Sequence, residues 1–288
     1  MLEITNISKT FHPGSVNEVF ALQNVSVTLN DGDFLIIIGT NGSGKSTLLN
    51  AVAGSFITDS GKISLSGHDI TKWPEHKRAS LIGRVFQNPF SGTAPTMTIA
   101  ENLSLAAKRG KPRGFNWALD KQLQSELGER IRTLNMGLED RLGNAIGSLS
   151  GGQRQALTLL MASWLKPDLL LLDEHTAALD PKSADQVIRL TKEIIERDRL
   201  TTLMVTHSMQ QAARVSQRTA FFHLGKMVEY GTTDQIINTP KEAYTQALVS
   251  VRSIDHDEKP HAAPVLSVQN VTARYKGTNF DVLKNVTV

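Results

Sequence analysis

Several residue types are missing or scarce in this chain, and each absence excludes a class of function. The 288 residues include no cysteine, which excludes disulfides, thiolate metal sites and cysteine redox chemistry. Aromatic residues make up 6% of the chain, and no apolar run approaches the roughly 20 residues that a membrane-crossing helix needs. Because the first residues do not combine a basic stretch with an apolar core, we expect no signal peptide.

Charge of one sign is not in large excess either. Lys and Arg number 31 against 28 Asp and Glu, and the resulting net charge of +3 is spread along the chain. We therefore expect no nucleic-acid partner. Hydrophobic residues make up 40% of the sequence, and its length allows a full α/β core with a smaller subdomain beside it.

The clearest motif is a glycine-rich segment that fits G-x-x-x-x-G-K-[ST], the pattern of a phosphate-binding loop. Apolar residues 34–38 precede it as a predicted buried parallel strand, and residues 47–53 follow it as the predicted start of a helix. Lys45 is expected to reach the β- and γ-phosphates, and the Ser46 hydroxyl to bind Mg²⁺. The residues predicted to bind nucleotide here are Gly39, Thr40, Asn41, Gly42, Ser43, Gly44, Lys45, Ser46 and Thr47.

The surrounding chain predicts a mixture of strands and helices. Residues 2–11 and 22–30 alternate apolar and polar side chains, as strands with one solvated face do. Residues 92–164 are predicted to be mostly helical, with a capping box at Thr98 and Glu101 that starts one of the helices. This region is expected to be a helical insertion between two halves of a sheet.

A strand–helix–strand unit follows the insertion. The leucine-rich residues 169–172 predict a central strand that ends in Asp173 and Glu174. Asp180 is the predicted N-cap of a helix that runs to about residue 198, and a strand at 201–206 comes next. Such a βαβ unit indicates a parallel sheet.

Polar side chains therefore follow three predicted strands where each strand ends: Lys45 and Ser46, then Asp173 and Glu174, then His207. Ligands of α/β sheets bind at the carboxyl ends of the strands, so we expect these side chains to surround one point. Phosphoryl transfer to water needs a metal-holding group and a group that positions water. Of two adjacent carboxylates, one can hold Mg²⁺ while the other activates the water.

Taken in order, these motifs resemble those of the ATP-binding-cassette ATPases. The resemblance covers residues 1 to about 250. It rests on the phosphate loop, Gln87, residues 149–153 (Leu-Ser-Gly-Gly-Gln), residues 169–174, residues 178–180 and His207. It implies an α/β fold of the P-loop NTPase class, with a RecA-like parallel sheet core, an antiparallel β subdomain and a helical subdomain at about 88–164.

The resemblance also implies a role for individual residues. Phe11 would stack on the adenine of ATP, and Gln87 would sense Mg²⁺ and touch the permease. Asp173 would be the carboxylate that binds Mg²⁺, Glu174 the general base, and His207 a contact of the γ-phosphate. Glu174, His207 and Gln87 are thus the implied catalytic residues, and Ser46, Gln87 and Asp173 the implied metal site.

Family members work as pairs of domains packed head to tail, and this implies partners. Ser150, Gly151, Gly152 and Gln153 would complete the ATP site of the opposite domain, with Asp180 across the interface. The implied partners are integral-membrane permease subunits, a second ATPase subunit in a homo- or heterodimer, and an extracytoplasmic substrate-binding protein. The implied location is the cytoplasmic face of the cell membrane. His175 departs from the family, where many members have a small residue or proline.

The transported substrate is left open, because different segments resemble different importers. Residues 79–180 resemble ATPases of aromatic amino-acid importers, residues 208–238 those of phosphate importers, and residues 240–248 those of peptide importers. One alternative is a soluble ATPase of the same class that acts on nucleic acid or the ribosome, but the chain lacks the long coiled coil or charged linker of those proteins. A regulator without turnover is the other, and the intact Glu174 and His207 argue against it.

The end of the sequence repeats its beginning. Residues 251–264 are a predicted polar linker between a first domain at 1–250 and a short segment at 265–288. Residues 266–272 echo residues 2–8, with an asparagine recurring in register. We interpret the segment as the truncated start of a second ATPase domain, which would not bind ATP because it stops before a second phosphate loop.

Overall fold

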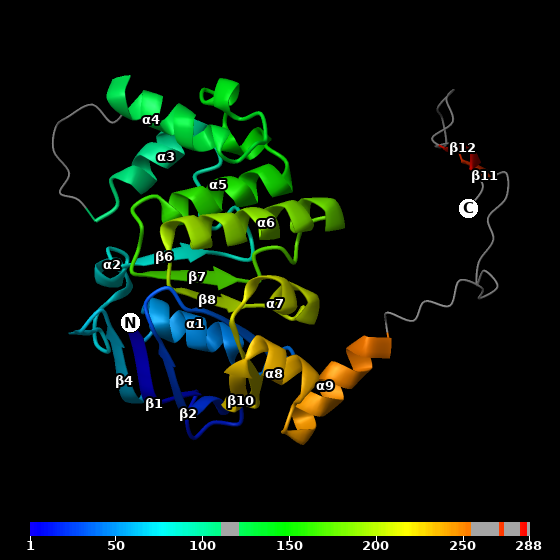
Figure 1. Ribbon diagram of the computed structural model, residues 1–288. Coiled ribbons are helices and arrows are strands. Elements are labelled where there is room, and N and C mark those ends of the chain that lie inside the picture. Colours follow the sequence, from blue (N-terminus) through cyan, green and yellow to red (C-terminus); the bar gives the residue numbers. More distant parts are fainter. Residues whose placement is uncertain (111–120, 255–270, 274–282, 287–288) are drawn as a thin grey trace. The chain divides into compact units, whose positions relative to one another are not determined.

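The computed structural model describes residues 1–110, 121–254, 271–273 and 283–286 (Figure 1). Contacts divide the chain into two compact units, Met1–Val249 and Ser250–Val288. The helices are α1 (Lys45–Ala53), α2 (Glu75–Arg78), α3 (Ile99–Ala107), α4 (Lys121–Arg132), α5 (Gly151–Ser163), α6 (Pro181–Asp198), α7 (Met209–Val215), α8 (Thr233–Asn238) and α9 (Ala243–Ile254), with 3-10 turns η1 (Glu139–Arg141) and η2 (Ile146–Ser148). Within the described ranges, none of these helices is long and apolar enough to cross a membrane.

A six-stranded sheet in the order β10-β9-β3-β8-β7-β6 lies at the centre of the first unit. Its strands are β3 (Phe34–Gly39), β6 (Ile82–Val85), β7 (Leu169–Asp173), β8 (Thr202–Val205), β9 (Arg218–His223) and β10 (Lys226–Thr232). All neighbours pair in parallel except β10, which pairs antiparallel with β9. The predicted parallel core is confirmed: β3 and β8 bury every residue, as apolar strands covered on both faces do.

Successive residues of the central strands face two separate cores. Phe34 and Ile36 of β3 belong to a buried cluster that includes residues of α3 to α7, which we call the helical-side core. Leu35 and Ile37 belong to a second cluster that includes α1 and the antiparallel sheet. This is the alternation of side chains along a strand. Because both faces are covered, the accessible polar groups of the sheet lie at the ends of its strands.

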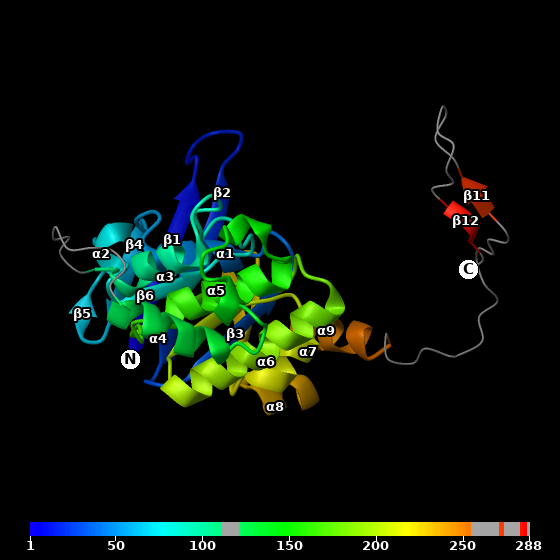
Figure 2. The same cartoon turned by 90° about the horizontal axis from the view of Figure 1, so that it is seen from above.

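The antiparallel sheet has the order β2-β1-β4-β5 and packs beside α1 (Figure 2). Its strands are β1 (Leu2–Phe11), β2 (Val19–Leu29), β4 (Ser60–Leu65) and β5 (His68–Asp69). The two strands predicted at the start of the chain are confirmed. The second begins three residues earlier than predicted because its pairing with β1 continues to Phe11 and Val19.

The helical region contains α3, α4 and α5. The predicted capping box is present: Thr98 Oγ1 accepts the Glu101 N–H, and the Glu101 carboxylate accepts the Thr98 N–H. Before α3 begins, residues 92–97 form turns and bends, and Thr98 makes an isolated bridge with Ala145. Gly92 and Pro95 fall in that stretch and disfavour a helix there.

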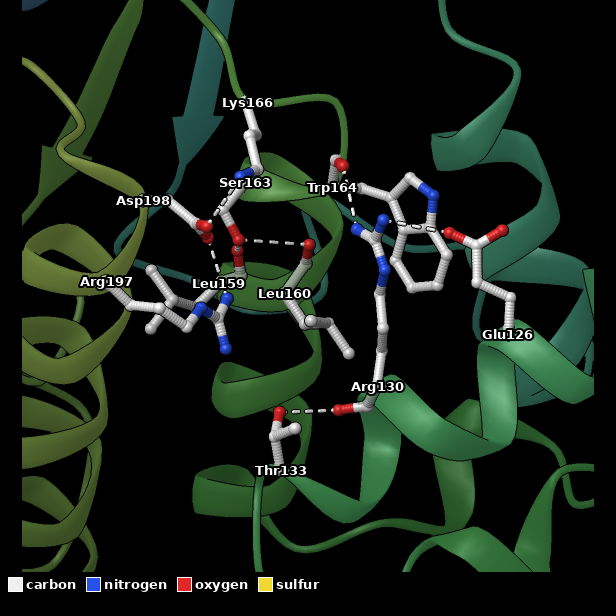
Figure 3. A network of polar contacts seen from close by, with 10 residues as sticks. All are labelled: Glu126, Arg130, Thr133, Leu159, Leu160, Ser163, Trp164, Lys166, Arg197 and Asp198. Atoms are coloured by element: carbon white, nitrogen blue, oxygen red, sulfur yellow. Dashed lines mark hydrogen bonds and ion pairs between the residues drawn. The ribbon is translucent and has the colours of Figure 1, made fainter.

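Polar contacts at the end of α5 join it to α4 and α6 (Figure 3). Arg130 of α4 donates to the carbonyl of Trp164 at 2.9 Å, lies over the indole ring at 4.1 Å and pairs with Glu126 at 2.8 Å. Lys166 pairs with Asp198 of α6 at 3.0 Å. A cation at a helix C-terminus satisfies carbonyls that have no partner within the helix. The Arg130 contacts thus join two helices of the helical region, and the Lys166–Asp198 pair attaches the end of that region to α6.

The described part of the predicted linker and repeat is small. Helix α9 continues to Ile254, so the first four linker residues are helical, and residues 255–264 lie outside the described residues. Within 265–288, β11 (Val271–Ala273) pairs antiparallel with β12 (Leu283–Val286). The interpretation of this segment as the start of a second ATPase domain stays a prediction.

Candidate functional site

The predicted phosphate loop connects the end of β3 to the start of α1. Gly44 is the N-cap of α1 with a φ of 105°, and Gly42 has a φ of 77°. A Cβ at Gly44 would meet the carbonyl oxygen of Ala21 at 2.5 Å, and one at Gly39 would meet that of Phe222 at 2.3 Å. Glycine is therefore required by space at Gly39 and by both space and backbone angle at Gly44.

Lys45 is held inside the loop. Its side chain is buried, and the Nζ donates to the carbonyl oxygens of Gly39 and Thr40, both at 2.9 Å. Burial lowers the pKa of Lys45, while the nearby carboxylates of Glu174 and Asp173 act in the opposite direction. The ammonium is thus kept at the mouth of the loop, with two carboxylates near it.

A hydroxyl and a carboxylate meet beside the loop. The Oγ of Ser46, in the first turn of α1, donates to Oδ1 of Asp173, the last residue of β7, at 3.1 Å. Burial raises the pKa of the Asp173 carboxyl, opposed by the Ser46 hydrogen bond and the positive charge of Arg84. A carboxylate that burial disfavours as an anion gains from a cation placed beside it.

The donor set of this pair fits Mg²⁺, which prefers hard oxygen ligands and keeps several waters. Gln87, which follows β6 by two residues, has an amide oxygen and lines the same pocket as Ser46. Among the described residues, no three His, Cys, Asp or Glu side chains group closely enough to hold a metal ion. An ion here would therefore depend on the Ser46 hydroxyl, the Asp173 carboxylate, Gln87, water and phosphate oxygens.

Glu174 and His207 lie together at the ends of β7 and β8. The Glu174 Oε2 is 3.6 Å from the His207 Nδ1. The Glu174 N–H donates to the carbonyl of Val205 at 2.9 Å, and its φ of 42° is in the left-handed region, which is uncommon for a residue with a Cβ. Backbone strain of this kind concentrates at functional sites. The turn aims the carboxylate at the end of the sheet where the loop lies.

An open pocket of about 1010 Å³ lies over the loop. Loop residues 41–47 form its floor, with Gln87 and Glu174 beside them. Phe11 forms part of the wall and packs edge-on against Phe56, with ring centroids 5.3 Å apart. The pocket therefore combines backbone amides at a helix start, a lysine, carboxylates and an aromatic ring, which suits an aromatic ligand that carries phosphates.

The predicted signature residues 150–153 do not line this pocket. Ser150 is the N-cap of α5: its Oγ accepts the Gln153 N–H, and the Gln153 side chain accepts the Ser150 N–H. Ser150 and Gly151 are exposed. Gly152 is buried, and a Cβ at this position would lie 2.9 Å from the Cβ of Ser183. Asp180 is an N-cap as well, for α6. The start of α5 at Ser150 is thus exposed and lies outside the pocket of its own chain.

Sequence reasoning missed part of the pocket wall. Val19 and Phe20 of β2 and Leu224 of the turn after β9 line the pocket, and all three are more than half exposed. Val19 and Phe20 precede the predicted start of that strand at residue 22. The only sequence signal for them was that two apolar residues stand side by side next to a predicted loop. Nothing local marks Leu224, because its place depends on the pairing of β9 with β3.

The family model and the similar proteins of known function point to the same protein family. Residues 22–177 match the family model described as ABC transporter. The tyrosine transport ATP-binding protein of Clostridioides difficile is 44% identical over 230 residues, which cover 79% of this chain and 90% of that protein. A methionine import ATP-binding protein of Bacillus anthracis is 32% identical over 285 residues, covering 96% and 79%.

Solved structures agree in fold. A dimeric ATP-binding cassette in a post-hydrolysis state, bound to ADP and phosphate, is 27% identical with a TM-score of 0.70, and the match covers 81% of this chain and 99% of that one. The ADP conformation of another transporter cassette is 25% identical with a TM-score of 0.71, covering 86% and 98%. The predicted fold class, a P-loop NTPase with antiparallel and helical additions, is confirmed.

Proposed function

This chain belongs to the ABC transporter family, and we propose that it powers the import of an amino acid. Similarity to its relatives identifies the chain as the ATP-binding, ATP-hydrolysing subunit of an import-type transporter. Such subunits work with membrane permeases and form dimers. The alternative of a soluble ATPase acting on nucleic acid or the ribosome is not favoured. Both relatives named above carry amino acids in their names, and the 44% identity to the tyrosine transport protein supports an aromatic one.

ATP and Mg²⁺ are the proposed ligands of the pocket over the phosphate loop. Bound there, ATP supplies the phosphoryl group that is transferred to water, and Mg²⁺ neutralises charge on the phosphates. Lys45 and the loop amides hold the phosphates, and Phe11 packs against the base. Ser46 and Asp173 hold the cation, with Gln87 beside them. The single observation that carries this proposal is the 3.1 Å contact between Ser46 and Asp173 beside a buried Lys45.

Glu174 is the proposed general base. Its carboxylate lies at the pocket, adjacent in sequence to the cation-holding Asp173, where it can orient a water and accept its proton. His207, whose Nδ1 is 3.6 Å from the Glu174 Oε2, would hold this carboxylate and donate to the γ-phosphate.

The second half of the site is proposed to come from another subunit. Ser150, Gly151, Gly152 and Gln153 do not line the pocket of their own chain, yet they present an exposed helix N-terminus, which favours anions. In a dimer of two copies, the partner subunit's Ser150 and Gly152 would close over the phosphates. One subunit alone is then expected to hydrolyse ATP poorly.

The membrane partners are proposed to bind the helical region. Phe90, in the segment after Gln87, and Leu105 of α3 are 48% and 56% exposed, apolar groups suited to contact with a permease. We place the subunit at the cytoplasmic face of the membrane, with an extracytoplasmic substrate-binding protein delivering the amino acid to the permease. Uptake of labelled amino acids, tyrosine and methionine first, into vesicles that contain this chain, its co-purified permease and the substrate-binding protein tests the substrate. Uptake of none of them would contradict an amino-acid importer.

The ATPase assignment has its own test. The purified full chain should hydrolyse ATP only with Mg²⁺ and with a rate per subunit that rises with protein concentration, because each site needs two subunits. Lys45→Ala removes the ammonium that reaches the phosphates and should abolish ATP binding. ATP affinity at the wild-type level in this variant would overturn the assignment of the loop.

A further inference from the structure

A tyrosine of the last helix of the first unit touches the phosphate loop. The Oη of Tyr244, in the first turn of α9, lies 3.4 Å from the Thr40 nitrogen, which donates to it, and 3.3 Å from the Thr40 Oγ1. Thr40 and Tyr244 are 204 residues apart in the sequence. We propose that Tyr244 is a positioning residue for ATP binding, which fixes Thr40 and thereby the turn that holds Lys45. The proposal rests on the assignment of the loop as the nucleotide site.

Thr40 connects the tyrosine to the lysine. Its carbonyl oxygen accepts a hydrogen bond from Lys45 Nζ at 2.9 Å, while its N–H and Oγ1 contact Tyr244. A rotation of the Thr40 peptide would move this carbonyl and the ammonium that it holds. The loop amides that follow Thr40 line the pocket floor, so the same rotation would change their directions. The Tyr244 hydroxyl opposes that rotation from outside the pocket.

The tyrosine ring is itself held in place. It stacks on the imidazole of His223, with centroids 4.1 Å apart and an angle of 32° between the planes. His223 is the last residue of β9, directly after Phe222, which is the register partner of Gly39. The ring is therefore packed on the strand pair from which the phosphate loop starts. Its hydroxyl reaches Thr40 from a fixed position.

The start of α9 is anchored to the sheet as well. Both carboxylate oxygens of Glu229, in β10, accept backbone N–H groups just before the helix, from Lys241 at 2.9 Å and from Glu242 at 3.2 Å. A carboxylate at a helix start also interacts favourably with the helix dipole. Leu248 and Val249 pack on the helical-side core. The segment 240–248, which resembles the tail of peptide-importer ATPases, thus has a structural task at the nucleotide site.

The test is the variant Tyr244→Phe, which keeps the ring and its stacking and removes the hydroxyl alone. Loss of one hydrogen bond that orders the loop should raise the Kd for ADP with Mg²⁺, measured by titration calorimetry, by about 3- to 10-fold. The KM for ATP should rise in parallel, while kcat at saturating ATP stays within about twofold, because the hydroxyl touches neither the water nor the γ-phosphate.

A matched control is Tyr230→Phe. This hydroxyl also makes two long-range contacts, accepting from Arg218 at 3.0 Å and donating to the Thr28 carbonyl at 3.4 Å, and it does not touch the loop. The control should lose a similar amount of thermal stability and keep wild-type affinity for ADP. A role of Tyr244 in stability alone would instead give both variants the same Kd.

A double-mutant cycle with Thr40→Ala tests the part of the contact that the Thr40 hydroxyl makes, since the N–H that donates to Tyr244 is kept. If the hydroxyl carries part of the effect, the Kd of the double variant rises by less than the product of the two single effects. Wild-type ADP affinity in Tyr244→Phe would overturn the proposal. Wild-type protein that binds no ADP, with Lys45→Ala indistinguishable from it, would instead overturn the nucleotide site itself.

Discussion

The Oγ of Ser46 and the Oδ1 of Asp173 lie 3.1 Å apart, although 127 residues separate them in the sequence. Ser46 is placed by the glycine-rich turn that starts α1, and Asp173 by the end of the buried strand β7. Two unrelated local features thus deliver a hydroxyl and a carboxylate to one point. This pair is the basis for the proposed Mg²⁺ site, and it gives the first prediction.

Asp173→Asn keeps the shape of the side chain and removes its charge. We expect ATPase activity to fall by on the order of 10²-fold or more, because the charge that holds the cation beside the phosphates is lost. ATP binding without Mg²⁺ should change little, whereas the gain in affinity that Mg²⁺ gives the wild type should disappear. Titrations with and without Mg²⁺ check this, and an unchanged Mg²⁺ effect would exclude Asp173 as a ligand.

Glu174→Gln should separate ATP binding from hydrolysis. The amide cannot accept a proton from water, so turnover should fall by roughly 10²- to 10⁴-fold, the usual contribution of a general base. ATP would then stay bound between two subunits. Light scattering should report a stable dimer with ATP and Mg²⁺ and a monomer without nucleotide. Turnover at the wild-type rate would remove Glu174 from the role of base.

His175 predicts a specific sensitivity to acid. It is buried, its Nε2 lies 3.0 Å from Thr191 Oγ1, and burial lowers its pKa from the usual 6.5 to about 4. Between these two pH values the unfolded chain binds more protons than the folded one. The free energy of unfolding therefore falls as the pH drops from 6.5 to 4, and above pH 6.5 His175 causes no loss. The loss amounts to about 3 kcal/mol.

Urea unfolding at several pH values measures this contribution, with His175→Gln for comparison. The variant should be less sensitive than the wild type to acid within that window, whatever its stability at pH 7. The exposed His12 provides the control, since His12→Gln should keep the wild-type profile. Equal acid sensitivity in wild type and His175→Gln would contradict a neutral, buried imidazole.

Arg78 is predicted to be essential for stability rather than for chemistry. It is 1% exposed, and its guanidinium donates to the carbonyls of Ala51 and Val52 in α1 at 2.7 and 2.8 Å, and to those of Trp73 and Thr71 at 2.9 and 3.0 Å. Arg78→Met would remove these donors, and the Ala51 carbonyl would keep only the Gly54 N–H at 3.3 Å. The expected cost is about 3 kcal/mol or more in the free energy of unfolding.

Unfolding in urea also checks this prediction. Lys77, which neighbours Arg78 and lies over the Trp73 ring at 3.8 Å, is the control, because Lys77→Met should cost no more than about 1 kcal/mol. A similar loss in both variants would mean that the carbonyls near the end of α1 find other partners.

Local patterns were enough to predict the framework of the site. The apolar run of β3, the glycines after it and the leucines before Asp173 each specify their own conformation, and sheet topology then brings the strand ends together. The contact of Tyr244 with Thr40 was not predictable in this way. It depends on how α9 packs across β9 and β10, which no short segment encodes.

Two features of the site could not be predicted from local sequence patterns, each for its own reason. They are the wall of the pocket and the role of the signature residues. Leu224 reaches the pocket through the pairing of β9 with β3, a relation between distant segments. Ser150 is the N-cap of α5 and is exposed. Its proposed ligand belongs to another subunit, so neither the sequence nor the fold of one chain brings the two together, and the family resemblance supplied that step.

The central claim is that two copies of this chain share each ATP site, and mixing two inactive variants tests it most directly. Lys45→Ala removes the loop lysine. Ser150→Asp keeps a residue that caps helices well and places a negative charge against the phosphates. Each variant alone should be inactive. A mixed dimer pairs the intact loop of one subunit with the intact Ser150 of the other, so an equimolar mixture should recover about a quarter of wild-type ATPase activity, given random pairing. Activity no higher than the sum of the separate variants would contradict the account.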